Sequence, residues 1–424
     1  MNPYTLIKKQ HHKGAQKIWL LFWFWIGLRF GLPIIFQASL YLLSALNVII
    51  GLFFGGIFLF FFLSKQTFPR PQMPTLLFMI FFVLNLIASA FSPYVTSTNF
   101  LRIFGLLFMN LGIVLSLWLA SRLLSVEEYL SLAGKAFATG FIIALILLVA
   151  SNATGFLASG SDQRFGDENL LHPNTIGVAS GIGLLFSLLL PIYRKQLYKI
   201  AVPLILVITL LSTVSKTSIG GFLLAISFAL LFFRGKDKLR TWVLAIGAIG
   251  VGIIIFGDFL FEQINNYLQN ERIFSTISGR AQMWDFVLHS IPKRSWIGFG
   301  YSVFKDAFEP TRLLLFYRVP IVHAHNAFMD VLFSTGYLGL ITFIFFLTTI
   351  YLTIVKETLL SSKRKGIAML ALSASIFIAI RTFTESALNL GFDTWILLTV
   401  YYSLEKTRLE RWQMKILTKR NSIQ

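Results

Sequence analysis

Two histidines separated by a single residue are the sharpest chemical feature of this 424-residue sequence. His323 and His325 stand directly before Asn326 and a long apolar run. Neutral imidazole accepts a proton from a hydroxyl near pH 7, so a catalytic or substrate-orienting role is one interpretation. A hydrogen-bonded pair that fixes the start of a helix is a second. A metal site is a third, although the chain has no cysteine and no further ligands follow at the usual spacing.

Cationic side chains accompany these histidines in the same segment and in two earlier ones. Guanidinium groups pair with phosphate oxygens in bidentate geometry, whereas lysine acts as a point charge. Lys216 lies between two apolar runs, where a buried charge needs a partner unless its long stem carries the ammonium to the surface. We therefore expect an anion site near His325, with its cations drawn from Arg164, Lys216, Arg280, Arg312 and Arg318.

Polar residues mark the start of a further apolar run. His172 and Pro173 precede it, and Asn174 or Thr175 is expected to cap its first turn. A plain cap with a turn-forming proline explains this pattern. A helix start beside Arg164 would also suit an anion, which makes His172 a candidate for substrate binding.

Arg381 and Glu385 are spaced one helical turn apart inside another apolar segment. We expect a structural ion pair between them.

The elements that must position these residues are membrane helices. Hydrophobic residues make up 56% of the chain and charged residues only 13%, against about 25% charged in soluble domains. Apolar runs of about 20 residues fit helical crossing of a bilayer. The expected fold is an all-α polytopic membrane protein with about twelve spans, near residues 18–36, 40–63, 74–92, 103–120, 136–153, 175–192, 199–213, 218–233, 241–261, 326–355, 367–386 and 389–404. The tenth is longer than a bilayer needs, so it is either tilted or begins outside the membrane.

Basic residues indicate how the spans are oriented. With both termini in the cytoplasm, every inside segment is rich in Lys and Arg, as such segments usually are. This explains the net charge of +19 without a nucleic-acid partner. The histidines then lie on the outer face of the membrane, and the basic C-terminal tail lies against anionic lipid.

The predicted organisation has three parts. Residues 1–261 hold nine spans, residues 262–325 form a long extracytoplasmic catalytic loop, and residues 326–424 hold three spans and the tail. Apolar residues at helical spacing predict a short surface helix over residues 282–289. Two Gly-x-x-x-Gly spacings, Gly51/Gly55 and Gly177/Gly181, allow close helix approach.

Missing motifs narrow the function. The absence of cysteine excludes disulfides and thiolate chemistry. Neither a P-loop nor a dinucleotide fingerprint is present, and we expect no cofactor. An enzyme working outside the cell needs an energy-rich donor already in the membrane. A glycan linked to a lipid pyrophosphate fits, because its anion would meet the cations and its lipid would lie among the helices.

Three segments resemble the O-antigen ligase and O-antigen polymerase superfamily. They are H323-AHNAFMDVLFSTGYLGL-340, S278-GRAQMWDFVLHSIPKRSWIGFGYSVF-304 and S212-TVSKTSIGGFLLAI-226, and the resemblance covers roughly residues 212–400. It implies a polytopic, metal-independent membrane glycosyltransferase that takes a glycan from an undecaprenyl-pyrophosphate carrier on the outer face of the bacterial cytoplasmic membrane. Attack by the acceptor hydroxyl from the face opposite the pyrophosphate would invert the anomeric configuration. By position, His325 would be the base or acceptor-orienting residue and Arg280 would contact pyrophosphate. Lys216 stands where the family usually has Arg, which replaces a guanidinium fork with a point charge.

The sequence does not identify the molecule that accepts the glycan. A polymerase joins the glycan to another carrier-linked glycan, and a ligase joins it to lipid A core. The polymerase is favoured because nothing visible in the sequence specifies a lipid A core partner. Other membrane proteins of polysaccharide assembly are possible partners of either enzyme. A solute transporter, which would use Arg381, Glu385 and Asp393, and a structural scaffold are the rival classes.

Overall fold

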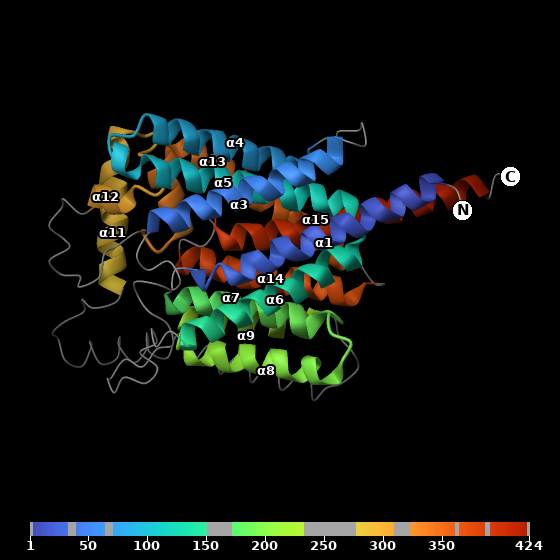
Figure 1. The fold of residues 1–424 in the computed structure, drawn as a ribbon. Coiled ribbons are helices and arrows are strands. Elements are labelled where there is room, and N and C mark those ends of the chain that lie inside the picture. The colour runs from blue at the N-terminus through green and yellow to red at the C-terminus, as the bar shows by residue number, and fades with distance from the viewer. Residues whose placement is uncertain are drawn as a thin grey trace.

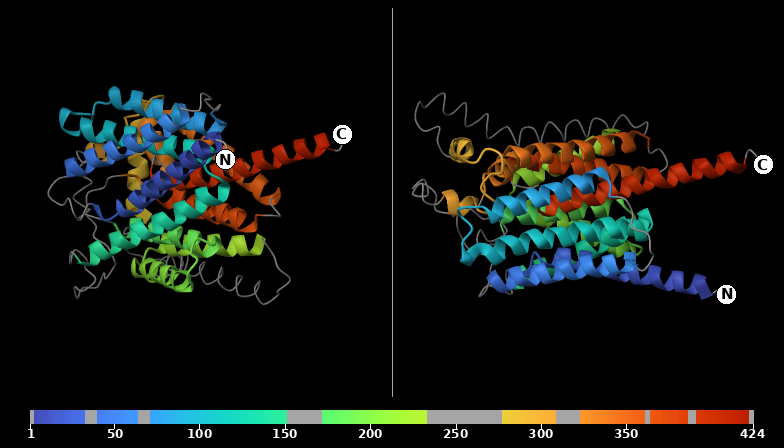
Figure 2. Two further views of the ribbon diagram at one scale, coloured as in Figure 1. Left: turned by 45° about the vertical axis from the view of Figure 1, so that its right-hand side comes forward. Right: turned by 90° about the horizontal axis from the view of Figure 1, so that it is seen from above.

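The computed structural model describes residues 3–32, 40–63, 71–150, 172–232, 277–308, 323–360, 364–385 and 391–421. These residues form a bundle of long, roughly parallel helices and contain no β-strand (Figure 1). Helix α11 lies across one end of the bundle, which we call the α11 end. The N- and C-terminal helices project from the other, the terminal end (Figures 1 and 2).

The helices are named here in chain order. Their bounds are α1 Pro3–Leu28, α3 Leu40–Leu63, α4 Met73–Ala90, α5 Ser97–Leu123, α6 Val126–Ala150, α7 Pro173–Leu189, α8 Gln196–Ser212, α9 Lys216–Phe232, α11 Ile277–Ser290, η2 Ile291–Lys293, α12 Phe304–Phe308, α13 Ala327–Leu360, α14 Lys365–Thr384 and α15 Phe392–Asn421.

The all-α architecture confirms the predicted fold class. Helices occupy eleven of the twelve predicted spans, and the span near 241–261 lies outside the described residues. Several helices exceed their predicted lengths, most of all α1, which begins at Pro3, and α15, which runs to Asn421. Within the described residues, five helices are by themselves long and apolar enough to cross a membrane: Met73–Ala90, Asn99–Leu123, Val126–Ala150, Ala327–Leu359 and Lys365–Thr384. The total number of crossings stays a prediction.

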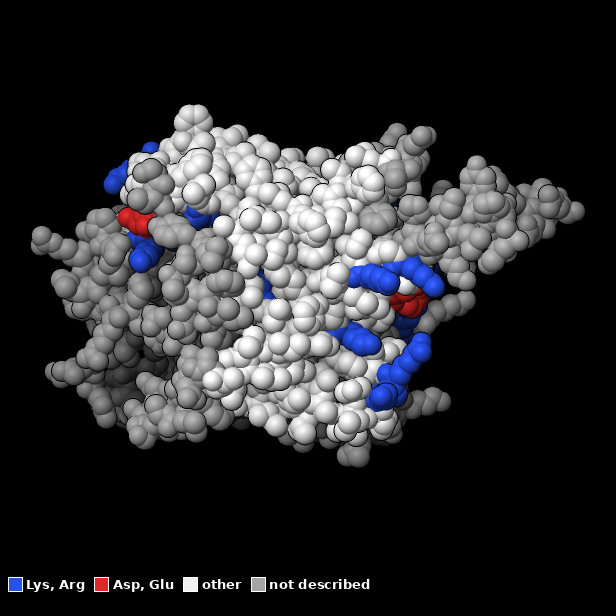
Figure 3. All heavy atoms as spheres, viewed as in Figure 1, with Lys and Arg blue, Asp and Glu red and all other residues white. Residues whose placement is uncertain are grey.

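Charge is distributed as a membrane requires. On the face shown in Figure 3, a broad band nearly free of Lys, Arg, Asp and Glu separates charged groups at the two ends of the bundle. Both termini lie at one end, as an even number of crossings would give (Figure 2). The chain is thus a helical membrane protein.

Aromatic side chains and glycines hold the helices together. Trp19 of α1 stacks on Tyr129 of α6 at 4.7 Å between ring centroids and donates its indole N–H to the Tyr129 carbonyl at 2.8 Å. The backbones of helices α3 and α5 are in contact at two glycines. A Cβ added at Gly112 would lie only 2.4 Å from the Gly51 carbonyl oxygen. The close approach predicted from Gly51 is confirmed.

Helix α13 is broken at Gly336, whose φ of +62° is open to glycine and costly for other residues. The segment after η2 fills the break. Phe299 and Gly300 donate backbone N–H groups to the carbonyls of Phe333 and Ser334, both at 2.8 Å, and Tyr337 donates to the Ser295 carbonyl at 2.8 Å. The long tenth span therefore consists of two helical pieces. Its length had suggested a tilted helix or one that begins outside the membrane, but not a kink.

Helix α11 includes the predicted surface helix over residues 282–289 and extends it to Ile277 and Ser290. It lies across the ends of the long helices (Figure 1). Its Val287 is fully buried, and the Phe286 ring packs 5.0 Å from Phe308 of α12 and 5.9 Å from Phe333 of α13. These contacts attach the α11 end to the bundle.

Candidate functional site

The loop that carries the two histidines is fixed from both sides at Ala324, which is completely buried. The Ala324 N–H donates to Asp330 Oδ1 at 2.8 Å, one turn into α13. The Ala324 carbonyl accepts from the indole N–H of Trp284 on α11 at 2.9 Å. Asn326 caps α13, because its Oδ1 accepts from the N–H groups of Phe328 and Met329 at 3.0 and 3.2 Å. The loop is therefore held in one conformation.

His325 itself has a left-handed backbone, with φ of +51°. Such a conformation is uncommon outside glycine and costs of order 1–3 kcal/mol unless the surroundings impose it. It directs the imidazole at α14, where Nδ1 lies 3.1 Å from Oε2 of Glu385. Strained backbone that aims a titratable group at a carboxylate is typical of a working site.

Glu385 directly follows α14 and is buried. Its second oxygen, Oε1, accepts from Nδ2 of Asn174 on α7 at 2.8 Å. Burial alone would raise the pKa of Glu385, but the hydrogen bond and charge of His325, with the charges of Arg381 and His323, lower this pKa to about 2. Glu385 is thus a carboxylate at neutral pH, shared between α13 and α7.

The contacts continue from α7 to the start of α9. Ser218 Oγ lies 3.5 Å from the Asn174 carbonyl oxygen, and Ser215 Oγ donates to Ser218 Oγ at 3.0 Å. Helices α7 and α9 can approach closely here because Gly177 has no side chain. A Cβ at this position would lie 2.8 Å from Ser218 Oγ. Val214, in the turn before α9, has φ of +48°, a genuine outlier for a β-branched residue.

Lys216 is the first residue of α9 and is exposed. The serine–asparagine–glutamate contacts therefore connect its helix terminus with His325. A helix N-terminus favours anions because its first N–H groups lack partners within the helix. The start of α9 is thus joined to the imidazole by hydrogen bonds, and Lys216 directly follows Ser215, the last residue in that series.

Hydrogen bonding assigns the imidazole protons. A carboxylate only accepts, so His325 donates Nδ1–H to Glu385, and the lone pair of the neutral ring is then on Nε2. His323 has the opposite arrangement, because its Nδ1 accepts from the His325 backbone N–H at 3.4 Å. The two rings lie 4.3 Å apart between centroids at 68°. Among the described residues nothing bonds to Nε2 of His325, so this nitrogen can act as a base.

The other predicted site residues divide into three groups. Asn326 and His172 are helix caps at the site, and Asn326 Nδ2 also donates to the Phe383 carbonyl at 3.4 Å. Arg280 lies in the first turn of α11, and its side chain is outside the described part of the structure. Arg164, Arg312 and Arg318 fall in residues 151–171 and 309–322, which also lie outside it.

Two sequence predictions are wrong. Arg381 pairs with Asp393 of α15, at 3.2 Å between Nε and Oδ2, and not with Glu385. The spacing rule fails because α14 ends at Thr384, and Glu385 has an extended backbone with φ of −147° and ψ of 164°. His172 rather than Asn174 caps α7, since the helix begins at Pro173, a favoured first position, and His172 Nδ1 accepts from the Asn174 N–H at 3.1 Å.

The fold also completes a set of possible metal ligands. His323, His325 and Glu385 bring one ligand atom each to within 4.8 Å of one another. The third ligand missing from the sequence pattern is Glu385, which directly follows α14 and lies 60 residues after His325. Both Glu385 oxygens already accept a hydrogen bond, so a metal ion here would share the carboxylate with Asn174 and His325.

Sequence reasoning missed the roles of Glu385 and Asn174. One available signal was the acid itself, because a carboxylate at a membrane segment is costly and is a functional candidate by default. For Asn174, a neutral amide beside a helix start, the sequence holds no signal that separates a cap from a carboxylate donor.

Comparisons with known proteins bear on the same region. Residues 200–344, which include α9, α11 and the histidine loop, match the model of a family described as O-antigen ligase. A protein named O-antigen ligase from Pseudomonas aeruginosa is 24% identical over 135 residues, which is 32% of this chain and 29% of that relative. The match thus spans less than a third of the relative's length. These findings support the resemblance to the O-antigen ligase and O-antigen polymerase superfamily that the sequence motifs carry.

Proposed function

We propose that this chain is a membrane glycosyltransferase that moves a glycan from undecaprenyl pyrophosphate to a sugar hydroxyl, with His325 as the base. One observation carries the proposal: His325 and Asn174 share the buried carboxylate of Glu385 at 3.1 and 2.8 Å. This arrangement fixes the imidazole tautomer and leaves Nε2 as a proton acceptor. Similarity to the family described as O-antigen ligase supports the reaction class.

The reaction is a single displacement that inverts the anomeric centre. The acceptor hydroxyl oxygen forms a bond to the anomeric carbon while the bond from that carbon to the pyrophosphate oxygen breaks. The hydroxyl proton passes to His325 Nε2, and undecaprenyl pyrophosphate leaves with the bonding electrons. Glu385 stabilises the imidazolium that results, because its carboxylate keeps the Nδ1–H bond.

Cations stabilise the departing pyrophosphate. Lys216 and the N-terminus of α9 supply positive charge. Hydrogen bonds from Ser218 through Asn174 and Glu385 join this helix start to His325. In this proposal Arg280 is a further pyrophosphate contact, and Arg164, Arg318, His323 and His172 bind the substrates. These cations then stabilise the negative charge that develops on the leaving oxygens, so no metal ion is needed. Transfer should accordingly persist after dialysis against a chelator, and loss of transfer that zinc restores would contradict this part.

Membrane orientation completes the proposal. The α11 end faces the outside of the cytoplasmic membrane, residues 262–325 form the catalytic loop between two sets of spans, and both termini are inside. Because the chain has no cysteine, single cysteines can be introduced without background. A cysteine at exposed position 288 of α11 should react with an impermeant reagent in whole cells, and one at exposed position 412 of α15 should not.

Two acceptors fit this chemistry. A carrier-linked glycan as acceptor makes the enzyme a surface-polysaccharide polymerase, which we favour from the sequence. Lipid A core makes it a ligase, and the names of the matched family and relative favour that alternative. A null mutant separates them: without a polymerase, single repeat units are still transferred, whereas without a ligase, long carrier-linked chains accumulate.

The catalytic role is tested by His325→Ala, assayed with a purified lipid-linked donor. We expect a loss of transfer of about 10²–10⁴-fold, the usual contribution of a positioned base. His289→Ala is the matched control, because this histidine lies in α11, is exposed, and interacts with Asp285. Unchanged transfer by a folded His325→Ala protein would remove the imidazole from the mechanism.

A further inference from the structure

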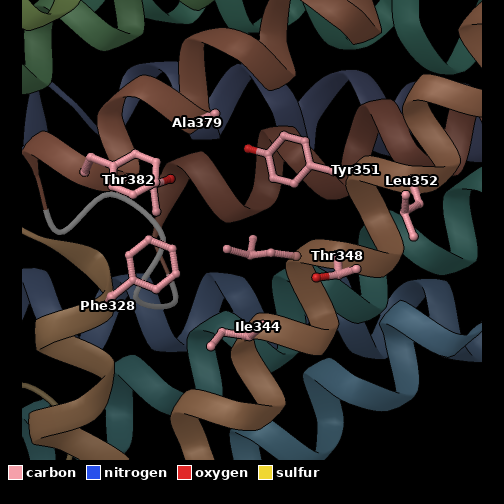
Figure 4. Close-up of a pocket in the computed structure, with 9 residues that line it drawn as sticks. Phe328, Ile344, Thr348, Tyr351, Leu352, Ala379 and Thr382 are labelled. Atoms are coloured by element: carbon pink, nitrogen blue, oxygen red, sulfur yellow. The ribbon is translucent and has the colours of Figure 1, made fainter.

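An apolar groove opens between α13 and α14, beside the candidate site. Its volume is about 370 Å³, near the lower end of the range of roughly 300–1,000 Å³ for small-molecule sites. Figure 4 shows side chains from both helices around this space. It is lined by Phe328, Ile344, Leu347, Thr348, Tyr351, Leu352, Ala379, Thr382 and Phe383.

The polar atoms of the lining are largely occupied elsewhere. The Tyr351 hydroxyl donates to the Ser375 carbonyl at 3.1 Å. The Thr382 hydroxyl donates to the Ile378 carbonyl at 2.8 Å, within its own helix. A ligand in the groove therefore meets methyl groups and aromatic rings. Hydrocarbon fits this surface, whereas a sugar or a charged headgroup would lose its hydrogen bonds to water.

One end of the groove reaches the catalytic pair. Phe328 lies three residues after His325, and Phe383 lies two residues before Glu385. Their rings pack 5.4 Å apart between centroids. Asn326 ties the two walls together through its bond to the Phe383 carbonyl. From Ile344 to Leu352, eight residues of helix rise add about 12 Å of wall away from that end.

We propose that this groove holds the polyprenyl chain of the donor next to its pyrophosphate. This inference rests on the proposed function. The donor is an anion joined to a long hydrocarbon chain. In this protein an apolar groove adjoins His325. Hydrogen bonds join His325 to the start of α9, whose first residue is Lys216. A carrier chain held in the groove aligns the bond to be broken with His325, and it selects a long-chain carrier over a short one.

The test blocks the groove from each wall in turn. Ile344→Trp and Ala379→Leu place larger side chains in the space. Ile341→Trp is the matched control, because Ile341 is 48% exposed against 45% for Ile344, and it does not line the groove. Each protein is assayed with the same glycan on an undecaprenyl and on a short-chain carrier.

We expect both groove variants to raise KM for the undecaprenyl donor roughly fivefold or more with kcat unchanged, since each methylene removed from apolar contact weakens binding severalfold. KM for the short-chain donor should not change, and Ile341→Trp should match the native protein with both donors. Equal KM values for Ile344→Trp and Ile341→Trp would overturn the inference while leaving the transferase intact.

A binding measurement keeps the groove testable without turnover. A photoreactive amino acid at position 344 is illuminated in nanodiscs with undecaprenyl pyrophosphate, with position 341 as control. Cross-linking of the carrier at 344 and not at 341 supports the groove. Cross-links to phospholipid alone, unaffected by added carrier, would overturn it. Absence of transfer by the native enzyme would instead refute the proposed function.

Discussion

The two ends of the bundle use buried carboxylates differently. At the terminal end, arginines bind them: Arg411 pairs with Glu357, and Arg408 with Glu405. At the α11 end, Glu385 is bound by an imidazole and an amide. Arginine cannot give up its proton in a protein, so an arginine–carboxylate pair only holds helices together. A histidine–carboxylate pair leaves one ring nitrogen open, and chemistry becomes possible.

This contrast holds within the α11 end as well. Arg381 and Asp393 form a buried pair between α14 and α15, one turn before Glu385. These are charges that a transporter would use, yet here they bind each other. Their pairing frees Glu385 from Arg381 as a direct partner and makes its carboxylate available to His325.

The largest effect expected from breaking this contrast is at Glu385. In Glu385→Gln the amide can donate to His325 Nδ1, which moves the ring proton to Nε2 and removes the base. Transfer should fall by roughly 10²-fold or more. Glu385→Asp, which keeps the charge, should recover part of the activity. Native transfer by Glu385→Gln would mean that the carboxylate does not set the tautomer.

A buried ion pair at the terminal end should affect stability instead. Arg411→Ala leaves the Glu357 carboxylate, whose side chain is 3% exposed, without its partner. The free energy of unfolding should fall by about 3 kcal/mol in detergent, and kcat should not change. Adding Glu357→Gln should recover much of the stability, because no buried charge then remains. A large drop in kcat for the folded single variant would contradict the separation of the two ends.

The pH dependence of stability distinguishes Glu385 from an ordinary glutamate. Its pKa is lowered from 4.5 to about 2, so its carboxylate stabilises the fold above pH 4.5, and that stabilisation is lost as the pH falls toward 2. The native protein should therefore melt higher than Glu385→Gln above pH 5. The gap should narrow from pH 4.5 downward. A gap that is constant down to pH 2 would show that charge is not its source.

The smallest effect is expected at exposed pairs of the terminal end. Arg364 pairs with Glu127 and Glu410, whose side chains are 60% and 31% exposed. Water and salt screen such contacts, so Arg364→Ala should cost no more than about 1 kcal/mol, and less in high salt. A cost equal to that of Arg411→Ala would show that exposure does not separate the two kinds of pair.

Sequence patterns predicted the elements better than the contacts between them. Hydropathy located α3 and α4 to within two residues, because the bilayer dictates both helix length and apolar composition. The break at Gly336 was missed, since glycine is common in membrane helices and the residues that fill the break come from another segment.

At the site, local spacing found the histidines and failed for their partners. The fold joins His325 to a carboxylate 60 residues later, and Glu385 to an amide 211 residues earlier. No local period reports such contacts. The one local rule that applied, a pair one helical turn apart, assumed helix where α14 had already ended.

The split of α13 has a consequence for the order in which the chain folds. The residues that fill the gap at Gly336 precede α13 in the chain, as does the Trp284 indole that holds the histidine loop. These contacts can form as soon as α13 has been synthesised. Glu385 follows only at the end of the next helix, so a nascent chain carries a positioned but uncoupled imidazole until that helix docks. Under the proposed mechanism, the base is therefore completed only when that helix has docked.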